Sequence, residues 1–201
     1  MEQLRQTPSQ TVGPFFAYSL TAKQYDYPYD SLTDEALVGP DAPGPRIYIT
    51  GTLYDGQGAP IPDAIVELWQ ADPQGHHRTT SIDTNTNASN RRGFVGFGRM
   101  GTGTMAPGQF RFTTLKPGAI DATSAPHIDV ILMMRGSLRT LFTRLYFDDE
   151  AEANDRDPLF QTIPADRRAT LLARKRTVND ETEYVFDIHM QGPDETVFFD
   201  L

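Results

Sequence analysis

Two short patterns in the sequence place a histidine and a carboxylate two residues apart, namely His127-Ile128-Asp129 and Asp187-Ile188-His189. Side chains two positions apart on a β-strand point to the same face of the sheet, so either pair could offer an imidazole and a carboxylate to one metal ion, as in a cupin-like site. Solvent-facing strands also carry polar residues at alternate positions, and such a pattern arises there without any function. From the residues alone both interpretations stay open, and the second is the simpler.

Two other polar groups have metal-binding chemistry but unsuitable spacing. His76 and His77 are adjacent, and neighbouring residues on a strand face opposite sides, so both cannot point at one ion. The acidic run Asp148–Glu150, followed by Glu152, lacks the alternating ligands and the central glycine of an EF-hand loop. The sequence therefore favours exposed loop histidines, and it favours a solvated helix start or an interaction surface for the acidic run.

Arg135 stands at the end of an apolar run and just before Gly136. A charge at this place needs a partner if it is buried. Guanidinium groups bind carboxylates through two parallel hydrogen bonds, so Arg135 could bind the carboxylate of a ligand. A salt bridge at the end of a strand would explain the same residue equally well.

The N-terminal segment Thr7–Phe16 combines prolines, a glycine and adjacent aromatic residues without the periodicity of a core element. Such a segment either closes its own fold or packs on a partner chain and presents its backbone to a ligand. It belongs to a longer stretch rich in Pro, Tyr, Asp and Ser that ends in the Pro-Gly-rich residues 39–45. We therefore expect residues 1–45 to form an extended arm and residues 46–201 to form one folded domain.

The elements that must position these residues are mostly strands. Short β-branched or aromatic runs alternate with turns rich in Gly, Pro and Asp, which is typical of β-structure. The strands predicted in this way are 47–54, 64–69, 109–114, 128–133, 139–147, 183–189 and 196–199. The long polar stretch 78–105 is expected to be a surface excursion.

A single helix is predicted over residues 164–176. This segment has Pro at its start, an acid in its first turn and basic residues near its end, which complements the helix dipole. The whole pattern predicts an all-β protein: a two-sheet β-sandwich with an N-terminal arm and one short helix in its C-terminal half.

Charge and composition exclude several classes of partner. The chain has 27 acidic and 18 basic residues and a net charge of -9, which repels nucleic acids and anionic membranes alike. It has no cysteine, so disulfides, thiolate metal sites and cysteine nucleophiles are excluded. No apolar run approaches the roughly 18 residues of a membrane span, and residues 1–5 do not begin a signal peptide. We expect a cytoplasmic protein that binds neither nucleic acid nor membrane.

Several motifs, taken together, resemble the intradiol ring-cleaving dioxygenases. They are ITGTLYDGQG at 49–58, ELWQAD at 67–72, LKPGA at 115–119, APHI at 125–128, RLYFDDEA at 144–151 and ETVFFD at 195–200. The resemblance covers nearly the whole chain and implies the β-sandwich of that family. The N-terminal TPSQT and the closing ETVFFD are similar to the alpha chains of its protocatechuate-cleaving members.

Active members of the family hold ferric iron with two tyrosines and two histidines. The resemblance places His77 and Ile120 where the tyrosines stand, and His127 and Asp129 where the histidines stand. An imidazole and an aliphatic side chain cannot supply the phenolate donors that stabilise ferric iron. The resemblance therefore implies that these are vestigial ligand positions, and that the chain alone has neither a metal site nor a catalytic residue.

The resemblance also implies a division of labour between two subunits. A partner beta subunit would hold the ferric iron, and the complex would cleave protocatechuate with O2 to 3-carboxy-cis,cis-muconate. The alpha chain would form one wall of the substrate pocket through Thr11, Gly13, Pro14 and Phe15, while Arg135 would bind the substrate carboxylate. Two alternatives are a self-sufficient homo-oligomeric catechol dioxygenase, against which the missing tyrosines argue, and a transthyretin-like binding or structural sandwich.

Overall fold

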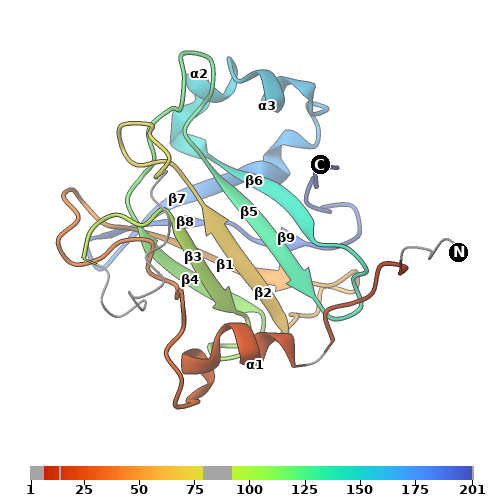
Figure 1. The fold of residues 1–201 in the computed structure, drawn as a ribbon. Helices are drawn as coiled ribbons and strands as arrows, with labels where there is room; N and C mark the ends of the chain where they lie inside the picture. The colour runs from red at the N-terminus through yellow and green to blue at the C-terminus, as the bar shows by residue number, and fades with distance from the viewer. Residues whose placement is uncertain (1–6, 14, 79–91, 201) are drawn as a thin grey trace, which may run out of the picture.

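The computed structural model describes residues 7–13, 15–78 and 92–200. These residues form a fold made mostly of strands, with short helices at two ends (Figure 1). The strands are β1 (Ile47–Tyr54), β2 (Ala64–Trp69), β3 (Phe97–Gly101), β4 (Gln109–Thr114), β5 (His127–Met134), β6 (Leu141–Phe147), β7 (Leu172–Val178), β8 (Glu181–Val185) and β9 (Ile188–His189). The helices are α1 (Phe16–Leu20), α2 (Ala151–Asn154) and α3 (Pro158–Thr162), and the 3-10 turns are η1 (Ala22–Tyr25), η3 (Asp148–Glu150) and η4 (Arg168–Leu171).

The strands form one curled sheet in the order β3-β2-β5-β6-β7-β8-β1-β4, with β9 pairing β1. The two ends of this order approach each other, because the backbone N–H of Arg111 in β4 donates to the sulfur of Met100 in β3 at 3.3 Å. The sheet is therefore a nearly closed barrel. The predicted all-β class is confirmed, whereas the predicted division into two packed sheets is not.

Alternation of apolar and polar residues explains how the sheet closes around a core. Successive side chains of β1 are alternately buried and half-buried, so one face of this strand lines the interior. Gly51 in β1 allows a close approach, since a Cβ there would lie 1.9 Å from the carbonyl oxygen of Phe186. The largest side chains that are fully enclosed include Phe110, Phe112, Phe147, Tyr184, Leu53, Leu68 and Leu132.

The helix predicted over residues 164–176 is wrong. The segment forms only the short turn η4 and then strand β7, which pairs with β8. The basic residues that suggested a helix end lie along this strand: Arg176 Nη2 is 2.6 Å from Glu183 Oε2, and the Lys175 backbone N–H donates to Asp148 at 3.0 Å. Pairing across the sheet thus overrides local helix propensity. The helices of the C-terminal half are instead α2 and α3, which precede this segment.

Three other expectations need correction. The stretch 78–105, predicted to be a surface excursion, contains strand β3, in which Gly98 and Met100 are buried against β2; residues 79–91 lie outside the described part of the chain. The predicted strand 183–189 is divided into β8 and β9. The predicted strand 196–199 makes only an isolated bridge, between Phe199 and Phe142. Within the described ranges, no helix is long and apolar enough to cross a membrane.

Candidate functional site

The positions that the resemblance compares with iron ligands lie around β2, β5 and β6, where the sheet register aligns three polar or aromatic residues. Trp69 lies opposite Asp129, and Asp129 lies opposite Arg144. The Nε of Arg144 donates to the carboxylate of Asp129 at 2.8 Å. Asp129 is therefore the counter-ion of an arginine, and this pairing competes with any role in metal binding.

His77 contacts the same row of residues through its ring. The imidazole stacks on the indole of Trp69 with the ring centres 4.2 Å apart and the planes at 21°. Its buried Nδ1 has no hydrogen-bond partner among the described residues. The His77 ring therefore packs on Trp69 as an aromatic group. Exposure was predicted for both loop histidines: it is confirmed for His76 and wrong for His77, which is half-buried because its ring packs on Trp69.

The loop that carries His77 packs on the loop that carries Ile120. Asp72 fixes the first loop, because its carboxylate accepts hydrogen bonds from the backbone N–H groups of Gln74 and His76, both at 2.9 Å. Gly75 adopts φ +83°, and a Cβ on it would lie 2.0 Å from the carbonyl oxygen of Ala119. Only glycine fits this contact. His77 and Ile120, which the resemblance compares with the tyrosine ligands, thus lie on neighbouring loops.

His127 is buried, and its ring contacts the backbone just before strand β5. Its Nδ1 lies 2.7 Å from the carbonyl oxygen of Ala125, and only 5% of the residue is exposed. Burial, together with the nearby Arg144 guanidinium, lowers the pKa of His127, so its ring is neutral at physiological pH.

The residues at these four positions do not fit a ferric site. Neither His77 nor Ile120 is a phenol, Asp129 is paired with Arg144, and 41% of Ile120 is exposed. No group of three or more His, Asp or Glu side chains is placed to hold a metal ion in the described ranges. In the second pattern, Asp187 accepts a hydrogen bond from the backbone N–H of Thr52 and His189 stacks on Tyr54, so each side chain already has a partner within the chain.

Asp157, a buried carboxylate that the sequence reasoning missed, links helix α3 to the backbone just before His127. Asp157 is 1% exposed and accepts hydrogen bonds from the backbone N–H groups of Ala125 and Phe160, both at 2.9 Å, and from the hydroxyl of Tyr146 at 3.2 Å. It is the N-cap of α3 and also fixes the strand end before His127. Asp followed by Pro158 at the first helical position was the signal in the sequence.

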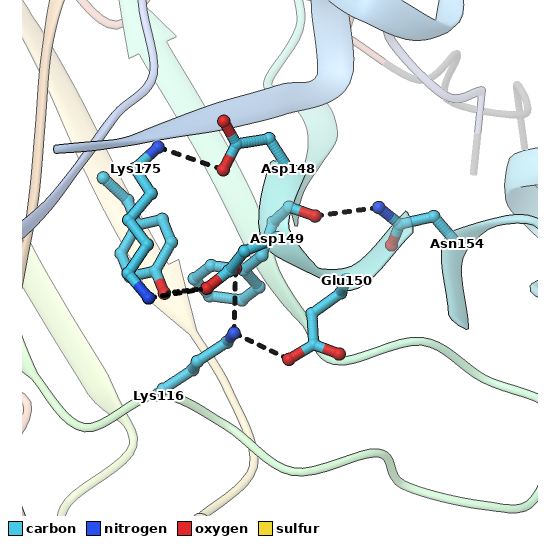
Figure 2. Close-up of polar contacts among 8 residues, drawn as sticks. Lys116, Asp148, Asp149, Glu150, Asn154 and Lys175 are labelled. Atoms are coloured by element: carbon cyan, nitrogen blue, oxygen red, sulfur yellow. Dashed lines mark hydrogen bonds and ion pairs between the residues drawn. The ribbon is translucent and has the colours of Figure 1, made fainter. Parts of the chain in front are cut away.

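The acidic run Asp148–Glu150 forms ion pairs and hydrogen bonds with residues of the same chain (Figure 2). The carboxylate of Asp149 accepts hydrogen bonds from Lys116 Nζ and Lys175 Nζ, both at 2.9 Å, and from the hydroxyl of Tyr184 at 3.0 Å. Partial burial opposes ionisation, but these three donors outweigh it and lower the pKa of Asp149 to about 2. Lys116 also donates to Glu150 at 2.6 Å.

Other hydrogen bonds drawn in Figure 2 join side chains of this region to the backbone. Asp148 accepts from the backbone N–H of Lys175, and the side-chain amide of Asn154 donates to the carbonyl oxygen of Phe147 at 2.8 Å. The run begins a helical segment, η3 and then α2, as the sequence predicts for a helix start. Its carboxylates hold strands β6, β7 and β8 together with the Lys116 turn.

Arg135 lies at the turn that follows β5, and its partner is an acid that the sequence reasoning did not single out. Its Nη2 is 2.9 Å from Asp63 Oδ2, and 60% of the Arg135 side chain is exposed. The turn continues through Gly136 at φ +92°, whose backbone N–H donates to the hydroxyl of Thr11 at 3.0 Å. The structure therefore brings the N-terminal arm to the Arg135 turn.

The other predicted pocket residues lie in the same arm. Gly13 adopts φ +78°, and Phe15 is 75% exposed; Pro14 lies outside the described residues. Val12 and, on the Arg135 turn, Leu138 are also large apolar side chains open to solvent. Exposed large apolar side chains in the arm and on the Arg135 turn are typical of surfaces that bind another chain.

The family model and similar relatives point to the same protein family. The family model described as Dioxygenase matches residues 13–192. The chain is 48% identical over its full length to the protocatechuate 3,4-dioxygenase alpha chain of Burkholderia cepacia and 41% identical to that of Pseudomonas putida, with 100% and 99% of those chains covered. It is also 33% identical to the protocatechuate 3,4-dioxygenase beta chain of Burkholderia cepacia, over 82% of this chain and 72% of that one.

A solved structure supports the same assignment. The dioxygenase domain of a dioxygenase and carbohydrate-binding protein fusion from Streptomyces sp. SirexAA-E superimposes with a TM-score of 0.61 and 26% identity, covering 96% of this chain and all of that one. A transthyretin-like module outside the family is therefore excluded. The chain belongs to the intradiol dioxygenase family and, within it, to the group of protocatechuate 3,4-dioxygenase alpha chains.

Proposed function

We propose that this chain is the alpha subunit of an α/β protocatechuate 3,4-dioxygenase and that it forms part of the substrate pocket without holding iron. The complex would open protocatechuate between its two hydroxyls with O2, giving 3-carboxy-cis,cis-muconate. The family depends in general on ferric iron, which we assign to the beta subunit. The observation that carries this proposal is the set of residues at the four ligand positions, which do not fit a ferric ion.

The contribution of this chain is substrate binding through Arg135. The carboxylate of protocatechuate needs a local cation, because the chain as a whole is acidic, with a net charge of -9. The ion pair with Asp63 joins Nη2 of Arg135 to one carboxylate oxygen, and the guanidinium carries further N–H donors that can bind a second carboxylate. A charge-assisted contact of this kind contributes about 1.5–3 kcal/mol, or about 10- to 100-fold in affinity.

The N-terminal arm would form the wall beside that arginine. Thr11 is hydrogen-bonded to the Arg135 turn, and the exposed Phe15 ring and the backbone of Gly13 follow within the same segment. We place Thr11, Gly13, Pro14 and Phe15 against the beta subunit, where burial of Phe15 would stabilise the complex.

Steady-state kinetics of the purified α/β complex test the proposal. Arg135→Ala should raise KM for protocatechuate about 10- to 100-fold while the iron content of the complex stays unchanged. Arg139→Ala is a matched control, since Arg139 lies on the same turn, its side chain is 77% exposed, and it forms a long ion pair with Asp200, at 3.8 Å. An unchanged KM in the Arg135 variant, or loss of iron, would refute the assignment.

A further inference from the structure

We propose that Asp63 is a positioning residue, which orients the Arg135 guanidinium toward the substrate carboxylate before substrate binds. The inference rests on the proposed function, because it takes Arg135 as the residue that binds substrate. It adds a second residue to that site, one that acts through Arg135 and does not touch the substrate.

The sheet register places these two residues opposite each other. Ala64, the first residue of β2, pairs with Met134, the last residue of β5, in an antiparallel ladder. Asp63 and Arg135 are the next positions outward on the two strands, so their side chains are cross-strand neighbours. Their 2.9 Å ion pair is therefore built on two strands whose pairing is fixed by a buried core.

The N-terminal arm supports both turns from outside. Its first contact is the hydrogen bond from the Gly136 N–H to Thr11, at 3.0 Å. Its second is Tyr25, whose hydroxyl lies against Gly103: a Cβ there would be 2.8 Å from that hydroxyl and 2.6 Å from the carbonyl oxygen of Pro62, the residue before Asp63. The turn that carries Asp63 thus contacts the segment after β3, where Tyr25 of the arm also packs.

The geometry favours orientation over competition. Asp63 Oδ2 contacts one terminal nitrogen of Arg135, so the remaining donors of the planar fork are presented in a fixed plane. Ordering one long side chain on binding costs about two- to tenfold in affinity. Because the Arg135 and Asp63 side chains are 60% and 37% exposed, water screens the pair, and we expect an effect at the lower end of that range.

A double-mutant cycle on the α/β complex tests the inference, with KM for protocatechuate, kcat and iron content as readouts. Asp63→Ala should raise KM about two- to fivefold with kcat and iron unchanged. In an Arg135→Ala background the same change should have no further effect on KM, because Asp63 acts only through that arginine. Asp41→Ala is the matched control: Asp41 pairs with Arg92 at 2.7 Å on the surface, beside the Phe94 segment at the far end of β2 and β3.

The outcomes separate this inference from the proposed function. If Arg135→Ala raises KM while Asp63→Ala leaves it unchanged or lowers it, Asp63 does not position the arginine and the inference is wrong. Equal effects of Asp63→Ala in both backgrounds would also overturn it, because they would show a role independent of Arg135. If Arg135→Ala itself leaves KM unchanged, the proposed function fails, and the inference fails with it.

Discussion

Asp157 is the single side chain whose loss should cost the fold most in the region behind the vestigial site. Asp157→Ala removes an acceptor shared by Ala125, Phe160 and Tyr146, all of which are at most 4% exposed. Loss of the N-cap of α3 costs about 1 kcal/mol. The Ala125 N–H and the Tyr146 hydroxyl each lose a buried acceptor, at about 1–2 kcal/mol each. The sum is about 3–5 kcal/mol of the free energy of unfolding.

Thermal unfolding of the purified complex measures this cost. For a chain of this size, 1 kcal/mol corresponds to about 2–4 °C, so Asp157→Ala should lower Tm by about 6–20 °C. The matched control is Asp155→Ala, because Asp155 is exposed and precedes the cap by two positions; it should change Tm by no more than about 2 °C. Equal, small shifts in the two variants would refute the claim that the buried carboxylate holds α3 and the His127 strand end together.

Two further predictions concern the loops around the site. Asp149→Asn should lower the free energy of unfolding by about 1–2 kcal/mol at pH 7, after a discount for solvent screening. Because the pKa of Asp149 is lowered to about 2 in the folded protein, this contribution is complete above the unfolded value of about 4 and is lost as pH falls toward 2. Urea titrations should therefore show the variant and the parent converging between about pH 4 and pH 2, and a constant difference would contradict the assignment. Gly75→Ala should be far more destabilising than Gly58→Ala by the same assay. Both residues have positive φ, but a Cβ at Gly75 meets Ala119 at 2.0 Å whereas nothing lies within 4 Å of one at Gly58. Similar losses in both glycine variants would show that the two loops do not pack as described.

The strands that the sequence predicted best are those with turns at both ends. Residues 47–54, 64–69 and 109–114 are strands with the predicted bounds, because alternating or continuous apolar runs are enclosed there by Gly, Pro and Asp. Strand β7 was predicted as a helix because its leucines and basic residues satisfy a helical pattern locally. Its partner strand β8 follows after the two-residue turn Asn179-Asp180, where both residues have positive φ, so a local hairpin signal was present and was missed. Asp148, in contrast, is distant in the sequence from Lys175, and local reasoning could not find that contact.

Some residues of the candidate site could likewise be predicted from the sequence, and others could not. His127 and Asp129 could be singled out from their strand spacing, whereas His77 and Ile120 could be identified as substituted ligand positions only through resemblance to a family. The partner of Arg135 could not be found from the residues alone, because Asp63 lies opposite it only through the pairing of Ala64 with Met134, which the structure gives. Asp157 carried a visible capping signal, but its contact with Ala125 depends on tertiary packing.

Anomalous diffraction at the iron edge, from crystals of the α/β complex, tests the central claim most directly. It locates each iron atom relative to the two chains. We predict one iron peak for each α/β pair, within the beta subunit, and no density among His77, Ile120, His127 and Asp129 of this chain. An iron peak coordinated by those residues would contradict the account.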